Sequence, residues 1–385
     1  MKTSRREMLT GLVGVGLAAL IGGSARAVQN SRWYDPATTP LGMTLSEAQQ
    51  DAGIAFLARH PTVDVHAHPG RFFLRNVEHP TPRIAAYGEP FEDRAIADML
   101  AGQVSAVLFS GVSDMSLLEF APDRGLFATR DFRPGEAWAD YRRQIGLLQA
   151  LVAAHKVLPG TNARDVRRAH LRHRTASIFA IEGGDFIEDR LDRVHQAHAD
   201  GVRSITIVHY HVNQIGDIQT SAPHHERLTP LGAAIVREMN RVGIIVDLAH
   251  APMSVVRGAV DVSTRPMMIS HSNLNRPGVE HPRLISPEMA RLVTRNGGIV
   301  GSVPSGIGQS NFAEWIDAIL RLVETVGVDH VAIGTDMDSN YMPVFTTHRL
   351  WHLIPSALLA RGMREPEVAA IMGNNFLRLF AANAR

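Results

Sequence analysis

The stretch Thr62-Val63-Asp64-Val65-His66-Ala67-His68 reads as an apolar strand that ends in two histidines one residue apart. In an extended strand, residues i and i+2 point to the same face, so His66 and His68 can direct both imidazoles to one point just past the strand's end. This arrangement suits a metal ion. Two surface histidines in a loop would give the same short motif, so its meaning depends on the rest of the chain.

Short apolar runs alternate along the chain with longer stretches of helical pattern. This alternation is expected of βα units around a parallel sheet. Eight such units predict an α/β fold, a (β/α)8 barrel of the TIM type. Such a barrel needs about 250 residues and leaves the rest of the chain for an N-terminal leader and loop insertions. The eight runs that read as strands are residues 63–67, 106–111, 177–181, 204–209, 243–248, 266–270, 298–303 and 330–334.

Helical signals between the strands include recognisable start residues. Ser286 reads as the N-cap of a helix that continues through Arg295, with Pro287 at its first position. Residues 46–59 and 312–326 also carry helical patterns, and the second has apolar side chains at a spacing that should face the core.

Two segments, residues 70–100 and 112–140, read as long loops or excursions from the barrel. The first contains Arg71, Arg75 and Arg83, which could close over a site. Solvent exposure is nevertheless the expected state of each arginine.

The N-terminus carries an export pattern. Arg5 and Arg6 form a twin-arginine motif, an apolar run covers residues 12–21, and Ala25-Arg26-Ala27 is a small-residue cleavage site. The run is too short to span a bilayer core of about 30 Å, although a membrane anchor is the alternative reading. We therefore expect residues 1–27 to be a twin-arginine-type signal peptide. Residues 28–385 would form a single barrel domain, in the periplasm or otherwise exported by this route, with no stable membrane span after cleavage.

The composition is that of a folded globular domain. Hydrophobic residues make up 45% of the 385 residues and charged residues 20%, which leaves enough apolar material for a full core. The 39 basic residues nearly balance the 38 acidic ones, and no basic stripe is interleaved with aromatic residues, so a nucleic-acid partner has no support. The absence of cysteine excludes disulfides and thiolate metal ligands.

Six of the eight predicted strands finish in a side chain that can bind a metal or transfer a proton. Barrel enzymes carry their chemistry at this C-terminal end of the strands. Histidine and carboxylate without thiolate suit zinc, manganese or another borderline cation. The strand-end residues are His66, His68, Glu182, His209, His250, His271 and Asp336.

Four of these histidines and Glu182 exceed the needs of one catalytic zinc, which usually has three protein ligands and a water. Two ions about 3.5–4 Å apart, bridged by Glu182, would use His66, His68, His250 and His271 as well. A water between two such ions loses its proton near neutral pH and becomes a nucleophile.

At these residues the chain resembles the membrane dipeptidase (renal dipeptidase) family, peptidase family M19, an amidohydrolase-like branch of the metallopeptidases. The matching motifs follow one another in the family's order over roughly residues 62–380. They are His66-Ala67-His68, Ile181-Glu182-Gly183-Gly184, Val208-His209 followed by Asn213, Asp247-Leu248-Ala249-His250, Ile269-Ser270-His271-Ser272-Asn273, Gly334-Thr335-Asp336-Met337-Asp338, and the segment from Met372 to Phe380.

The resemblance implies a (β/α)8 barrel with two zinc ions, in place of which other divalent cations could bind. One ion would lie near His66, His68 and Glu182, and the other near Glu182, His250 and His271. It also implies a homodimer.

By the same resemblance, three further residues would act on the substrate. His209 would stabilise the tetrahedral oxyanion and Arg283 would bind the substrate carboxylate, although Arg276 lies nearby. Asp336 would act as acid and base, taking the proton from the bridging water and delivering it to the leaving amine.

His68 departs from the family pattern, since many members have Asp at this position. A neutral imidazole in place of a carboxylate leaves the site more positive by about one charge. That difference could strengthen the pull on the bridging water, shift the metal preference or change the substrate range.

These features predict a dinuclear zinc dipeptidase that hydrolyses the amide bond of dipeptides or dipeptide-like small molecules. One alternative is an amidohydrolase-type barrel that acts on lactones, phosphoesters or N-acyl amino acids. Glu182 and the lack of a strand-end lysine argue against that alternative. Another alternative is a non-catalytic periplasmic metal-binding protein, for which Asp336 would have no use.

Overall fold

The computed structural model describes residues 41–77, 81–121 and 125–384, with the side chains of residues 82 and 83 left out. The export signal expected at residues 1–27 lies outside these ranges, so it stays a prediction, as does the domain boundary at residue 28. Within the described ranges, the search for a helix both long enough and apolar enough to cross a membrane finds none.

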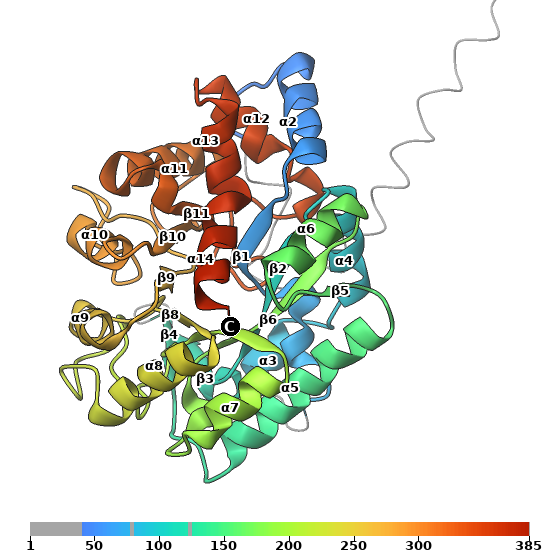
Figure 1. The fold of residues 1–385 in the computed structure, drawn as a ribbon. Coiled ribbons are helices and arrows are strands. Elements are labelled where there is room, and N and C mark those ends of the chain that lie inside the picture. The colour runs from blue at the N-terminus through green and yellow to red at the C-terminus, as the bar shows by residue number, and fades with distance from the viewer. Residues whose placement is uncertain (1–40, 78–80, 122–124, 385) are drawn as a thin grey trace, which may run out of the picture.

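Eight parallel strands close into a barrel (Figure 1). Neighbouring strands pair in chain order, and β11 pairs back with β1 to complete the ring. All eight overlap the runs expected from the sequence, so the (β/α)8 prediction is confirmed, although β7 ends at Thr206, three residues before His209. The strands are β1 (Val63–Ala67), β2 (Ala106–Val112), β6 (Ala176–Glu182), β7 (Val202–Thr206), β8 (Ile245–Asp247), β9 (Met268–Ile269), β10 (Ile299–Ser302) and β11 (Val331–Ile333).

Helices surround the barrel (Figure 1). Those in the described chain are α2 (Glu47–Arg59), α3 (Pro82–Ala86), α4 (Glu92–Ala101), α5 (Glu136–Ala153), α6 (Ala163–Leu171), α7 (Asp192–Ala199), α8 (Pro230–Val242), α9 (Met253–Val262), α10 (Pro287–Thr294), α11 (Phe312–Val326), α12 (Leu353–Ala360), α13 (Glu365–Ala369) and α14 (Asn375–Asn383). Short 3-10 segments are η1 (Pro69–Leu74), η2 (Met115–Leu117), η3 (Asp185–Ile187), η4 (Val328–His330) and η5 (His348–Leu350), and η6 (Ala370–Asn374) is a π-helical turn.

The expected helix starts are confirmed. The hydroxyl of Ser286 accepts a hydrogen bond from the backbone N–H of Met289, with Pro287 in the first turn of α10. The helices expected at residues 46–59 and 312–326 are α2 and α11, and α11 buries Ile316 and Ile319 as its spacing predicted.

The prediction of long loops at residues 70–100 and 112–140 is partly wrong. The first segment contains η1, α3 and α4, and the buried face of α4 consists of Ala95, Ile96 and Met99 together with Glu92. The second contains an antiparallel hairpin of β3 (Leu118–Ala121) and β4 (Gly125–Ala128). These elements are short, so their periodicity is weak in the sequence, and packing against the barrel stabilises them. A further two-residue strand, β5 (Leu158–Pro159), pairs in parallel with the first residues of β6.

The expectation of an exposed Arg71 is also wrong. Only 7% of this residue is exposed, and its guanidinium donates hydrogen bonds to the backbone carbonyls of Asp338 (2.8 Å) and Tyr87. Arg75 is exposed as expected and pairs with Glu92. The side chain of Arg83 lies outside the description.

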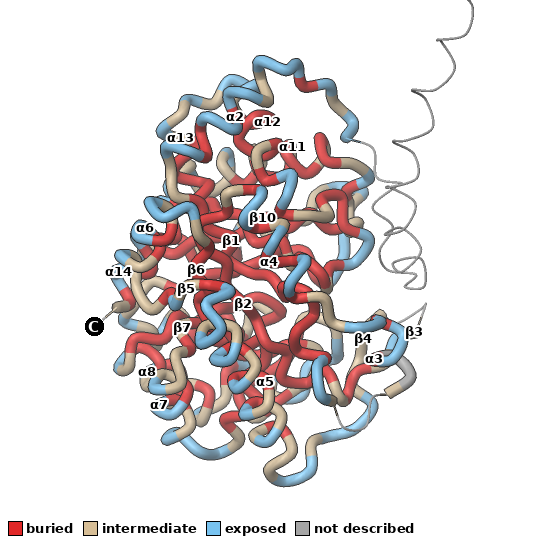
Figure 2. Tube along the Cα trace, turned by 90° about the vertical axis from the view of Figure 1, so that its right-hand side faces the viewer, coloured by how far each residue is buried: buried red, intermediate tan, exposed pale blue. Residues whose placement is uncertain are grey.

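The barrel interior is apolar at one end and polar at the other. Val65, Leu108 and Ile178 pack inside the barrel in one cluster with Phe376 and Phe380 of α14. The residues that alternate with them face outward and pack against the helices. Figure 2 shows that the buried part of the trace follows the strands, whereas the exposed residues lie on the outer helices and loops.

The C-terminal helix lies at the N-terminal end of the barrel. Asn375, at the start of α14, donates hydrogen bonds to the carbonyls of Val328 and Val331, where β11 begins. This packing fills the N-terminal end of the barrel, so the opposite end, where the strands finish in histidine and carboxylate, is the end open to a ligand.

Candidate active site

His66, His68 and Glu182 meet at the C-terminal ends of β1 and β6. The Nε2 atoms of the two histidines lie 3.2 Å apart. The Oε1 atom of Glu182 lies 3.5 Å from His66 Nε2, and its Oε2 atom lies 3.4 Å from His68 Nε2. All three residues are at most 2% exposed, and together they could hold one metal ion.

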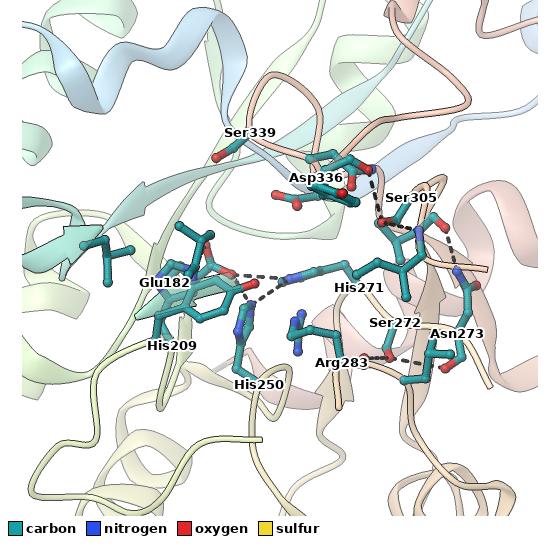
Figure 3. A pocket seen from close by; sticks show the side chains of 18 of the residues that line it. Glu182, His209, His250, His271, Ser272, Asn273, Arg283, Ser305, Asp336 and Ser339 are labelled. Carbon is teal, nitrogen blue, oxygen red and sulfur yellow. Dashed lines mark hydrogen bonds and ion pairs between the residues drawn. The ribbon is translucent and has the colours of Figure 1, made fainter. Parts of the chain in front are cut away.

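A second set of imidazoles contacts the same carboxylate. The Nε2 atoms of His250 and His271 lie 3.1 Å apart and are 3.1 and 3.4 Å from Glu182 Oε1. His209 approaches Glu182 Oε2 at 3.3 Å through its own Nε2. Figure 3 shows these side chains converging on Glu182.

The family resemblance and the distances in the structure give different ligands for the second metal ion. The resemblance implies Glu182, His250 and His271. By ligand-atom spacing, Glu182, His209 and His250 also form a group that could hold a metal. His271 lies as close to Glu182 Oε1 as the other rings do to its oxygens, so it can take part in the same site. Glu182 therefore lies between two groups of imidazoles. The second group contains His250 together with His209 or His271.

The donor set fits a metal. Oε1 of Glu182 is buried and accepts no hydrogen bond within the described part of the chain. A buried carboxylate oxygen without a partner is costly, and a cation at this position would satisfy it. Imidazole and carboxylate donors together suit zinc and neighbouring divalent ions.

Protonation also favours a cation here. Burial lowers the pKa of His250 and of His271 well below the usual value, so both rings stay neutral, which is the form that binds a metal. Burial alone would raise the pKa of Glu182, but the surrounding imidazoles hold it well below its usual value. Burial opposes protonation of His68, yet hydrogen bonds to Asp336 and Glu182 raise its pKa to about 10. The carboxylates of Glu182 and Asp336 thus favour a positive charge beside His68.

The outer nitrogen atoms of three candidate ligands, His66, His68 and His271, contact groups of the barrel, whereas Nδ1 of His250 has no hydrogen-bond partner among the described residues. Nδ1 of His68 donates to the carbonyl of Ser110 at 2.7 Å, which leaves Nε2 directed at Glu182. Ser270 Oγ lies 2.9 Å from Nδ1 of His271 and 3.4 Å from Nδ1 of His66. Such contacts fix the orientation and tautomer of a metal-binding imidazole.

Asp247, inside the barrel, holds Ser270 in turn. Its Oδ2 accepts from the hydroxyls of Ser270 and Thr206, each at 2.6 Å, and its Oδ1 accepts from the backbone N–H groups of Ser270 (2.9 Å) and Ala249 (3.1 Å). Because the Ser270 hydroxyl donates to Asp247, it can only accept from His271 Nδ1. The lone pair of His271 is therefore on Nε2, facing Glu182.

Asp336 lies at the mouth of this cluster after β11. Its Oδ1 is 3.1 Å from His68 Nε2 and 3.8 Å from His66 Nε2. Its side chain is 19% exposed, whereas those of the two histidines are at most 2% exposed. The backbone at Asp336 is left-handed (φ 53°), and its N–H donates to the carbonyl of His66 at 2.8 Å. A carboxylate that is close to the candidate metals but open to the cavity can exchange a proton with a ligand.

Arg283 reaches the same cavity from the segment before α10 (Figure 3). It is 9% exposed, and its NH1 donates to Gln219 Oε1 at 2.6 Å, with no ion pair to an acidic side chain among the described residues. The backbone N–H of Gln219 donates to the carbonyl of His250 at 2.8 Å. Arg276, the nearby alternative, instead donates to the carbonyl of Gly308 and does not line the cavity.

Two connected cavities lie above the cluster. The smaller, of about 80 Å³, is lined by Glu182, His209, His250, His271 and Asp336. The larger, of about 650 Å³, is lined by apolar and aromatic residues such as Phe120 and Ile307 and by polar or charged ones such as Arg71, Glu280 and Asp338. Arg283 and Tyr210 line both.

The structure thus brings together every residue expected at the site, at one end of the barrel. It also shows residues that the sequence reasoning missed as contributors, namely Asp114, Gln219 and Ser270. Asp114 follows β2 directly, and the pair Ser113-Asp114 at a strand end was the available signal. Gln219 contacts Arg283, and Ser270 contacts Asp247 and His66, at long distances in sequence, which no local pattern reveals.

Comparison with known families agrees with this geometry. The family model for Membrane dipeptidase (Peptidase family M19) matches residues 53–385. Dipeptidase tcpJ of Claviceps purpurea (strain 20.1) is 30% identical over 251 residues, which cover 62% of this chain and 59% of that protein. Dipeptidase verJ of Clonostachys rogersoniana is 27% identical over 270 residues, which cover 67% of this chain and 69% of that protein. The match to the first of these relatives therefore spans about three fifths of its length.

Solved structures of similar proteins share the fold. The probable dipeptidase PvdM from Pseudomonas aeruginosa superposes with a TM-score of 0.72 at 18% identity, covering 87% of this chain and 98% of that one. The dipeptidase AC, a metallopeptidase of family M19, gives a TM-score of 0.71 at 21% identity, covering 84% and 98%. A metallopeptidase from Rhodobacter sphaeroides, liganded with a phosphinate mimic of the dipeptide L-Ala-D-Ala, gives 0.70 at 20% identity, covering 84% and 99%.

We predict that Asp247→Asn destabilises the fold and weakens metal binding. An amide has one acceptor oxygen where Asp247 has two, so at least one of its four buried donors loses its partner, at a cost of roughly 1–3 kcal/mol. Metal affinity should fall about 10- to 100-fold, because Ser270 no longer fixes His271. Denaturant unfolding and metal titration measure the two effects. The exposed Asp261→Asn, at the end of α9, is the control and should change stability by less than about 0.5 kcal/mol.

Proposed function

Since this chain belongs to the membrane dipeptidase family, peptidase family M19, we propose that it hydrolyses the amide bond of dipeptides or dipeptide-like compounds. We further propose that it does so with two divalent metal ions, in the first instance zinc. The observation that carries the proposal is the position of Glu182 between two groups of imidazoles, each of which approaches one carboxylate at 3.1–3.5 Å.

Two ligand sets share Glu182. His66 and His68 would hold one ion with it, and His250 and His271 the other, with His209 close to the second. Bound divalent ions would polarise the amide carbonyl and lower the pKa of a water. The rest of the mechanism depends on the chain's own side chains.

Asp336 is placed to move the proton. Its carboxylate reaches the cluster through His68 at 3.1 Å and remains open to the smaller cavity. It would accept the proton of the attacking water and pass it to the amide nitrogen as the C–N bond breaks, so that the products leave as a carboxylate and an amine.

His209 faces the carbonyl side of the same cavity. Burial lowers its pKa, but the carboxylates of Asp114 and Glu182 raise it further than burial lowers it, so the net shift is upward. A ring that carries protons on both nitrogens can donate from Nε2 to an oxyanion, and the negative charge of that oxygen develops only in the transition state.

Arg283 would bind the carboxylate of the substrate. Its guanidinium is buried, is held by Gln219 and is directed at the cavity, so a substrate carboxylate would complete its hydrogen bonds. Because Arg283 lies between the two cavities, the carboxylate-bearing half of the substrate would extend into the larger one. A volume of about 650 Å³ exceeds the needs of a small side chain, so bulky side chains should be accepted on that half.

N-acyl amino acids are a second candidate substrate class, because they present the same amide and carboxylate to this site. A metal-binding protein without turnover would leave Asp336 without a role. We also propose export by the twin-arginine route, and the homodimer implied by the family resemblance remains a prediction.

The function is tested on the purified mature chain. We expect two metal ions per chain by mass spectrometry, and chelator-sensitive cleavage of members of a panel of L,L and L,D dipeptides. The same panel includes N-acyl amino acids, a lactone and a phosphoester. Bound metal with no dipeptide cleavage would contradict the proposal and favour one of the alternatives.

Asp336→Asn should lower kcat by about 10²- to 10⁴-fold, the usual contribution of a general acid–base group. Metal content should be unchanged, because Asp336 is not in either ligand set. The control is Asp329→Asn, an exposed aspartate at the opposite end of the same strand. Unchanged turnover in Asp336→Asn would remove Asp336 from the mechanism.

Arg283→Met should lower kcat/KM for dipeptides roughly 10- to 100-fold, the equivalent of one charge-assisted hydrogen bond of about 1.5–3 kcal/mol. A dipeptide amide, which has no carboxylate, should show little difference between the variant and the wild type. Arg276→Met is the matched control. A larger loss in Arg276→Met than in Arg283→Met would reassign the carboxylate site.

A further inference from the structure

Asp114 is a completely buried carboxylate that contacts His209 from behind. It follows β2 and is 0% exposed. Its Oδ1 lies 2.6 Å from Nδ1 of His209, and its Oδ2 accepts from the backbone N–H of Tyr210 at 3.0 Å. Both oxygens are thus used by two consecutive residues that follow β7.

The hydrogen bond between Asp114 and His209 determines which ring nitrogen of His209 is directed at the cavity. A carboxylate only accepts hydrogen bonds, so Nδ1 must carry the proton that it shares with Asp114. The ring is then fixed with Nε2 toward Glu182 at 3.3 Å and toward the smaller cavity (Figure 3). Ser110 and Ser270 provide weaker, neutral contacts to His68, His66 and His271, and Nδ1 of His250 has no partner among the described residues. Within the described part of the chain, His209 is therefore the one imidazole of this cluster with a carboxylate on its outer nitrogen.

A second pair of the same kind lies next to it and provides a comparison. Asp185 is 3% exposed, and its Oδ1 lies 2.7 Å from Nδ1 of His211, two residues after His209. Neither Asp185 nor His211 lines either cavity. The two pairs therefore share a buried carboxylate on Nδ1 but differ in whether the histidine faces the site, since Nε2 of the half-buried His211 lies 3.2 Å from Asp131 Oδ1 instead.

We propose that Asp114 is a positioning residue for the hydrolysis, which holds the His209 ring in the orientation that places Nε2 against the reacting carbonyl. The inference rests on the proposed function. Asp114 itself does not touch the substrate, and its effect passes entirely through His209. Its contribution should be larger in the transition state than in the bound substrate, because Nε2 meets charge that develops only during the reaction.

The test begins with Asp114→Asn. Tyr210 N–H and His209 Nδ1–H are bound by different oxygens of Asp114, and the amide puts an NH2 group in place of one of them, so one donor loses its acceptor and the hold on the ring is weakened. We expect kcat to fall about 10- to 100-fold, as for other partners that orient active-site imidazoles, with KM changed less than about threefold. The inhibition constant of a phosphinate dipeptide mimic, which imitates the tetrahedral anion, should rise in parallel with the loss of kcat/KM. Metal content should stay at the wild-type value.

Two further variants separate positioning from general damage to the fold. In a His209→Gln background, adding Asp114→Asn should cost less than about twofold in kcat, because a residue that acts only through His209 has nothing left to orient. Asp185→Asn is the matched control: it should lower the melting temperature as Asp114→Asn does, yet leave kcat within about twofold of the wild type.

Three outcomes would overturn the inference. The first is an equal kcat loss from Asp114→Asn in both backgrounds. The second is an equal loss in Asp185→Asn. The third is a loss of metal from Asp114→Asn, which would make Asp114 a support for a metal ligand instead.

The protonation of His209 Nδ1 can also be measured without a substrate. The ¹⁵N shifts of histidine-labelled protein should show a protonated Nδ1 at His209 that changes in Asp114→Asn, with the signal assigned by its absence in His209→Gln. A wild type that cleaves no dipeptide would contradict the proposed function, whereas this measurement would still test the role of Asp114. An Nδ1 without a proton in the wild type would refute that role.

Discussion

The site depends on one buried carboxylate. Glu182 is 2% exposed, and its two oxygens face imidazoles from four other strands. Removing an ionised carboxylate from water costs several kcal/mol unless positive charge compensates it. The raised pKa of His68 is consistent with positive charge being attracted to these carboxylates, and Oε1 accepts no hydrogen bond from the described residues. Cations held by the surrounding imidazoles would compensate the charge of Glu182, which fits the convergence of so many nitrogen donors on one place.

Hydrogen bonds inside the barrel hold several of these imidazoles through their outer nitrogen atoms. Asp247 orders Ser270, and Ser270 in turn orients His271. Asp64 plays a similar part on the other side. Its oxygens accept from the backbone N–H and hydroxyl of Thr335, from the N–H of His66 and from His348. These two aspartates are at most 1% exposed, and each ties neighbouring strand ends together. The geometry of the candidate metal ligands thus depends on hydrogen bonds inside the barrel.

The candidate metal ligands and the residues proposed to act on the substrate differ in their burial. Residues that would hold cations are almost completely buried, whereas Asp336 keeps 19% of its side chain exposed and Arg283 lies between the two cavities. A proton carrier must reach both the cluster and the substrate, and a carboxylate-binding guanidinium must be desolvated without being neutralised by another side chain. In place of an acidic partner, Arg283 has the neutral amide of Gln219, which leaves its charge for a ligand.

The sequence by itself determined the barrel and the strand-end residues. Continuous apolar runs such as Ile244-Ile245-Val246 are local signals of strands that are buried on both faces, and the polar residues that follow them mark the strand ends. The hairpin of β3 and β4, the burial of Arg71 and the support of His209 by Asp114 were decided only by tertiary structure. Asp114 and His209 are 95 residues apart in the chain. Their contact exists because β2 and β7 both flank β6 in the closed ring, and no pattern within either segment encodes it.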